Sequence, residues 1–146
     1  MVPVQHNAKL NQLLIDLGRS LLQYVGQSAS WTSPADRGLE QTFSALVSIQ
    51  RRHVAQLTDL LMQRRWTIDF GGFPHTYTDS HFLSLKYLLK LILVNQQQLV
   101  HELDEASHNC VDDPEAITVI DEILVSEKRI TEQLQSLLVV DQKQAK

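Results

Sequence analysis

Apolar residues recur at alternating steps of three and four in four separate stretches of this sequence. The first stretch carries such a seam at Leu10, Leu14, Leu17, Leu21 and Tyr24. The same spacing continues around Leu57, Leu89 and Ile120. This spacing places one apolar stripe on each of four helices. Since the stripes can bury themselves against one another, the pattern predicts an all-α fold, a four-helix bundle.

The predicted helices span approximately residues 7–27, 34–65, 80–109 and 114–140, in one domain of 146 residues. Ser33-Pro34 and Asp113-Pro114 mark two of the starts, because a capping side chain followed by proline suits a helix N-terminus. The third helix is expected to start near Asp79 or Ser80. A composition of 43% apolar residues with 5 Gly and 4 Pro is typical of a compact helical domain.

The connections between these helices differ in length, and the difference predicts a topology. Short links join the first helix to the second and the third to the fourth, which favours two antiparallel hairpins. The link between helices two and three is longer, with about 14 residues that can reach roughly 46 Å. A helix of about 25 residues is roughly 37 Å long. This link is therefore predicted to cross over the full length of the bundle.

Polar residues interrupt three of the four seams near their middle. They are Gln50 and His53 on the second helix, Gln96 on the third and Glu127 on the fourth. Their similar heights along the helices predict one polar layer inside the core.

With this layer and the long crossover, the chain resembles the ferritin-like superfamily, whose carboxylate members bind two metal ions between their four helices. Those members place a Glu on each of two helices and a Glu-x-x-His motif on the other two. On the second helix His53 matches the motif and Gln50 replaces the Glu. On the fourth, Glu127 matches and Ile130 replaces the His. The first helix offers Asp16, which is off the seam, and the third offers Gln96, with Glu102 about two turns away.

This incomplete ligand set favours a hydrogen-bonded structural layer over a metal site, because neutral amides are weak ligands for such cations. The sequence therefore predicts a non-catalytic bundle without a cofactor. The alternative is an iron- or manganese-dependent oxidoreductase, or an iron-handling protein, with a rearranged site at His53, Glu127 and Glu102. A third interpretation is a small-ligand binder that uses a cavity beside the polar layer.

Two further clusters of polar residues are candidate sites. His101, Glu105 and His108 lie at steps of four and three with Cys110 just beyond, which is compatible with a surface metal site. The simpler interpretation is a solvated helix face with histidines near the C-terminal end of the dipole. In the crossover, His75, Asp79 and His81 lie near Tyr77 and could face a ligand. The simpler interpretation is that Asp79 caps the third helix while the aromatic residues cover the bundle.

A second apolar stripe on the third helix predicts a further contact. It consists of Leu83, Tyr87, Leu91 and Val94. Either the crossover covers this stripe, or it forms the interface of a homodimer or binds a protein partner.

The charge and hydropathy patterns exclude two classes of partner. A net charge of -4 without a basic surface argues against nucleic-acid binding. The longest apolar run, residues 82–94, is interrupted by Lys86 and Lys90 and is too short to cross a membrane, which takes about 20 residues. A single cysteine and no visible secretory signal predict a cytoplasmic protein.

Overall fold

The computed structural model describes residues 4–28, 37–82 and 85–144, and within these ranges the chain is helical with no strand. This confirms the all-α prediction. In chain order the elements are α1 (Val4–Gly18), α2 (Leu21–Ser28), α3 (Arg37–Gln63), the 3₁₀ helix η2 (His75–Phe82), α4 (Leu85–Asn109) and α5 (Pro114–Gln144).

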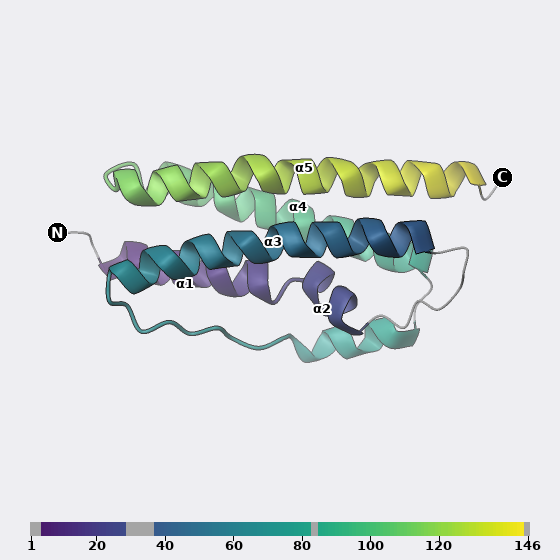
Figure 1. The fold of residues 1–146 in the computed structure, drawn as a ribbon, viewed down its shortest axis with the longest axis horizontal. Helices are drawn as coiled ribbons and strands as arrows, with labels where there is room; N and C mark the ends of the chain where they lie inside the picture. Colours follow the sequence, from purple (N-terminus) through teal and green to yellow (C-terminus); the bar gives the residue numbers. More distant parts are fainter. Residues whose placement is uncertain (1–3, 29–36, 83–84, 145–146) are drawn as a thin grey trace.

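The helices lie side by side along the long axis of the molecule (Figure 1). α1 and α2 follow one another along this axis, α3 returns beside them, and α4 and α5 form a second antiparallel pair. The chain after α3 runs back along the length of the molecule, so that α4 starts near the end where α3 starts. α3 and α4 therefore run in the same direction.

The first predicted helix, residues 7–27, is in fact two helices, and Ser20 explains the break. Its Oγ accepts a hydrogen bond from the backbone N–H of Gln23 at 3.2 Å, which is the contact of a helix N-cap. The N–H of Leu21 donates to Oδ1 of Asn95 on α4 at 3.1 Å. Capping starts a new helix at Leu21 and turns the Ser20 hydroxyl into the core.

The third predicted helix starts later than expected, at Leu85 rather than near residue 80. Residues 75–82 form η2 instead, in which the Thr78 hydroxyl donates to the carbonyl oxygen of His75 at 2.7 Å. Asp79 is exposed within η2 and does not cap α4, so that prediction was wrong. The start predicted for the second helix, at Ser33-Pro34, lies outside the described residues.

The side chain of Asn11 on α1 holds the crossover in place through hydrogen bonds to the crossover backbone. Asn11 donates to the carbonyl oxygen of Asp69 at 2.7 Å and accepts from the N–H of Asp69 at 3.0 Å. Close by, Gly71 has a φ of 66°, and a Cβ there would lie 2.7 Å from Cγ2 of Ile15. Both the left-handed backbone and the close approach require glycine at this position.

The core consists of two apolar clusters with a polar layer between them. One cluster gathers Leu10, Leu13, Leu14, Leu17, Leu57, Leu60, Leu61, Leu99, Leu103, Ala106, Cys110, Ala116, Ile120, Ile123 and Leu124. The other gathers Leu21, Leu22, Val25, Phe43, Leu46, Val47, Leu88, Leu89, Ile92, Ile130, Leu134 and Leu138. The boundary between the two clusters falls between Leu17 and Leu21, Val47 and Leu57, Ile92 and Leu99, and Leu124 and Ile130, and a buried polar residue lies at each boundary.

Candidate functional site

Six buried polar side chains form the layer between the two apolar clusters. They are Ser20, Gln23, Gln50, His53, Gln96 and Glu127, each at most 4% exposed. The structure therefore brings together the four residues that interrupt the predicted seams. It adds Ser20 and Gln23, which the sequence analysis missed because it treated residues 7–27 as one uninterrupted helix.

Glu127 is the acceptor on which the layer converges. Its Oε1 receives a hydrogen bond from Nε2 of Gln50 at 3.0 Å, and its Oε2 receives one from Nε2 of Gln96 at 2.8 Å. An ionised carboxylate only accepts hydrogen bonds, so two amide donors suit it. Glu127 is fully buried, and these bonds replace those that water would supply.

The rest of the network orients these amides. The oxygen of Gln50 accepts from the hydroxyl of Ser20 at 2.6 Å and from Nε2 of Gln23 at 3.2 Å. The oxygen of Gln23 in turn accepts from Nε of Arg51 at 3.3 Å. The oxygen of Gln23 therefore points towards the guanidinium, and the nitrogens of Gln50 and Gln96 point towards Glu127. Hydrogen bonds aligned in this way between opposite charges polarise and strengthen one another.

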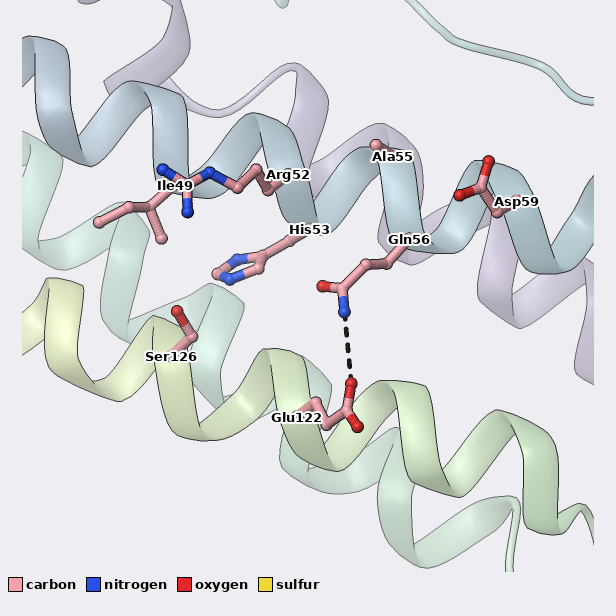
Figure 2. A pocket seen from close by; sticks show the side chains of 8 residues that line it. All are labelled: Ile49, Arg52, His53, Ala55, Gln56, Asp59, Glu122 and Ser126. Carbon is pink, nitrogen blue, oxygen red and sulfur yellow. Dashed lines mark hydrogen bonds between the residues drawn. The ribbon is translucent and has the colours of Figure 1, made fainter.

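His53 lies between the layer and the surface. Its Nδ1 is 3.3 Å from Oε1 of Glu127, and its side chain is 5% exposed. The imidazole lines a groove of about 510 Å³ between α3 and α5. Figure 2 shows the ring projecting from α3 into the space between the two helices, on the same side of Gln56 as Arg52. His53 is therefore the member of the layer through which the buried network meets the groove.

The geometry of the layer does not fit the di-metal site of the carboxylate ferritin-like proteins. The amide nitrogens of Gln50 and Gln96, which cannot ligate a cation, point at the two oxygens of Glu127. No group of three or more His, Cys, Asp or Glu side chains with metal-binding geometry occurs among residues 4–28, 37–82 and 85–144. A cation at Glu127 would lie beside these amide N–H groups, whose partial positive charge opposes it.

Glu102, the third residue of the alternative metal site, belongs elsewhere in the molecule. It lines a separate cavity of about 140 Å³ between α1, α4 and the crossover, together with Asp16. Burial raises the pKa of Glu102 to about 7, and a hydrogen bond shared with Asp16 and repulsion from its charge act in the same direction. Glu102 therefore forms a carboxyl pair with Asp16 and does not join His53 and Glu127.

This pair predicts a pH-dependent effect of Glu102→Gln. A pKa raised from 4.5 to about 7 means that protonated Glu102 contributes stability below pH 4.5, which is lost as the pH rises through 7. An uncharged Gln avoids that loss. We expect the variant to match the wild type at pH 4 and to exceed it at pH 8 by about 1 to 2 kcal/mol in urea unfolding, after allowance for solvent screening.

The control for this prediction is Glu105→Gln on the same helix, whose carboxylate is 55% exposed and pairs with His101. We expect this variant to show no comparable gain between pH 4 and pH 8. An equal gain in both variants would contradict the carboxyl pair, because it would point to a general effect of removing negative charge.

The cluster predicted near the end of α4 does not assemble into a metal site. His101 pairs with Glu105 at 2.9 Å, and Nδ1 of His108 contacts the carbonyl oxygen of Asp104 at 2.7 Å, both on the exposed face. Cys110 is buried in the apolar core, so its thiol does not face these histidines. Burial raises the pKa of this thiol, and the nearby Asp113 and Asp112 raise it further. The thiol is therefore a core group with little nucleophilic character.

In the crossover, Phe73 and Tyr77 cover the bundle while His75 and Asp79 are exposed, and the side chain of His81 lies outside the described residues. The rings of Phe73 and Tyr77 pack against Tyr24 of α2, with centroids 5.2 and 5.7 Å away. This packing agrees with the expectation that these rings cover the side of the bundle.

A second buried polar cluster, at the opposite end of α1, was not predicted. Asp113 precedes α5, is 3% exposed and accepts two hydrogen bonds from the guanidinium of Arg64, at 2.7 and 2.9 Å. It also accepts from the N–H of Ala116 at 3.3 Å, and His6 lies 3.4 Å from it. The Asp113-Pro114 pair indicated a helix start, but the partner at the end of α3 was too distant in sequence to be inferred.

The apolar stripe predicted on the third helix is only partly exposed. Tyr87 and Val94 are 52% and 64% exposed, whereas Leu91 packs against the core, and Leu83 lies outside the described residues. Within the described ranges no helix combines the length and the apolar character needed to cross a membrane.

No protein-family model and no curated protein matches this chain in sequence.

Proposed function

We propose that this protein is a non-catalytic, ferritin-like four-helix bundle that self-associates or binds a protein partner, and whose polar layer stabilises the fold in place of a di-iron site. The observation that carries this proposal is the orientation of the amides of Gln50 and Gln96. Their nitrogens donate to both oxygens of Glu127, so the carboxylate is satisfied by hydrogen bonds without a metal ion.

The path of the chain supports the ferritin-like part of the proposal. α1 with α2 pairs with α3, α4 pairs with α5, and one long connection returns along the molecule (Figure 1). Two antiparallel hairpins joined by a single long crossover distinguish ferritin-like bundles from bundles with short loops throughout.

The structural role of the layer is supported by its hydrogen bonding. An unpaired buried polar group costs about 1 to 3 kcal/mol. Here Ser20, which precedes α2, bonds to Gln50 of α3, and Gln50 and Gln96 of α4 both bond to Glu127 of α5. Such a layer also penalises sliding of one helix past another, because a shift of one turn would leave these groups facing leucines.

Self-association is supported by the exposed apolar side chains of α4. Val94 is 64% exposed, and Tyr87 lies two turns away along the same helix. We expect the wild type to sediment as a dimer and Val94→Lys to sediment as a monomer with unchanged helical circular dichroism, because a lysine at the centre of the contact would be buried without a partner.

Val111→Lys is the matched control, since Val111 is also exposed, at 71%, but lies in the turn between α4 and α5. This variant should remain dimeric. A wild type that stays monomeric at every concentration would overturn self-association through α4 and leave binding of another protein as the proposed role.

A further inference from the structure

The groove between α3 and α5 has an unequal distribution of charge along its length. On one side of Gln56 lie the guanidinium of Arg52 and the imidazole of His53, with Ser126 on the facing helix (Figure 2). Further along α3 lies Asp59, while Glu122 of α5 lies opposite Gln56 (Figure 2). A hydrogen bond from Nε2 of Gln56 to Oε2 of Glu122, at 3.3 Å, crosses the groove at this level.

The end with Arg52 and His53 has the donors that an oxyanion requires. A guanidinium offers paired N–H groups, a hydroxyl offers one O–H, and an imidazole with both nitrogens protonated donates from each. His53 is buried, with only 4% of its surface exposed. Its Nδ1 faces Glu127 but forms no hydrogen bond to any described residue. Its ring therefore lies between Glu127 on one side and the groove on the other, where a ring N–H can donate to a bound oxyanion.

The acidic end of the groove narrows the class of ligand. Asp59 and Glu122 repel a dianion such as phosphate and attract a cation. The six residues from His53 to Asp59 span about 9 Å along α3. A ligand with a carboxylate at one end and an ammonium group at the other, separated by several methylenes, matches both the charges and this span. The methylenes would lie along Ala55 and the stem of Gln56.

We propose that the groove between α3 and α5 binds a small carboxylate that carries a cationic group at its far end, with Arg52, His53 and Ser126 holding the carboxylate and Asp59 facing the cation. This site is independent of the proposed self-association, which uses the exposed face of α4. A ligand in this groove would also contact the polar layer, because His53 lies between the buried Glu127 and the groove.

The test is titration of the full-length protein with 6-aminohexanoate, followed through the His53 ring resonance in two-dimensional NMR. We expect a saturable shift of this resonance, and binding about five to ten times weaker in Arg52→Ala, which loses a charge-assisted hydrogen bond at a solvent-exposed position. Asp59→Asn should weaken binding about two- to fivefold, as expected for an exposed ion pair. Both substituted side chains are exposed, so the variants should fold.

Arg129→Ala is the control, since Arg129 is an exposed arginine on α5 that does not line the groove.

Hexanoate and hexylamine each carry only one of the two charged groups of 6-aminohexanoate. Hexanoate should bind more weakly than 6-aminohexanoate but still shift the His53 resonance. Hexylamine should shift this resonance least. The absence of a saturable shift with 6-aminohexanoate would overturn the site. Tighter binding of phosphate or of hexylamine would overturn the assigned ligand class, and equal losses in Arg129→Ala would show that the effect is general electrostatics.

Discussion

Replacing Gln50 by leucine is expected to lower the free energy of unfolding by about 2 to 4 kcal/mol. Gln50 is fully buried and bonds to Ser20, Gln23, Gln96 and Glu127. Leucine is of similar size, so the loss reflects hydrogen bonding more than packing. The Ser20 hydroxyl would lose its acceptor and the Glu127 carboxylate one of its donors, and neither is open to water. Urea unfolding followed by circular dichroism measures the change.

Gln41→Leu is the matched control, because Gln41 lies on the same helix and is exposed. A surface substitution of this kind usually changes stability by no more than about 0.5 kcal/mol. If Gln50→Leu were as stable as the wild type, the layer would not depend on its central amide, and the structural role proposed for it would be wrong.

Asp113→Ala is expected to cost about 3 to 5 kcal/mol, the typical cost of removing one partner of a buried ion pair. The guanidinium of Arg64, whose side chain is 9% exposed, would lose both of its bonds to the carboxylate. α5 would also lose the cap at its first turn, where Asp113 accepts from the N–H of Ala116. The adjacent Asp112 supplies the control: its side chain is 66% exposed, and Asp112→Ala should change stability by less than about 1 kcal/mol.

The pH dependence of this effect follows from the ionisation of Asp113. Burial by itself would raise its pKa, but hydrogen bonds from Arg64 and Ala116 outweigh burial, and the pKa is lowered from 3.8. The stability from this pair is therefore present above pH 3.8 and is lost as the pH falls through the lowered folded-state value. The difference between Asp113→Ala and the wild type should be fully present at pH 7 and shrink in strong acid, where Asp113 takes up a proton. A difference that persists unchanged at pH 2 would contradict the ion-pair explanation.

The fold class followed from the sequence because the spacing of apolar residues is a local signal. The positions of Leu10, Leu57 and Ile120 on their seams match their burial in the core. The break at Ser20 was missed because its cause is tertiary: Asn95 of α4 binds the N–H of Leu21, and Gln50 of α3 binds the Ser20 hydroxyl. The late start of α4 was missed because Asp79 is equally compatible with a cap and with a position inside a 3₁₀ turn.

Only those residues of the candidate site that interrupt an apolar seam could be predicted from the sequence. Gln50, Gln96 and Glu127 stand out in this way, and they lie within hydrogen-bonding distance of one another. Glu102 was assigned to the same site because only its distance along the helix was considered. Six residues from Gln96 amount to 600° of helical rotation, which turns its side chain towards Asp16 on α1. The groove beside His53 depends on the separation of α3 from α5, which helix periodicity does not report.

The most direct test of the structural polar layer is metal content, measured by mass spectrometry on protein purified without chelators and then loaded separately with ferrous iron, manganese and zinc. The account predicts no stoichiometric metal in any sample, because the amides of Gln50 and Gln96 occupy the two oxygens of Glu127. One or two metal ions per chain that disappear in Glu127→Gln but persist in the exposed control Glu132→Gln would contradict it and would restore the alternative of a metal-dependent protein.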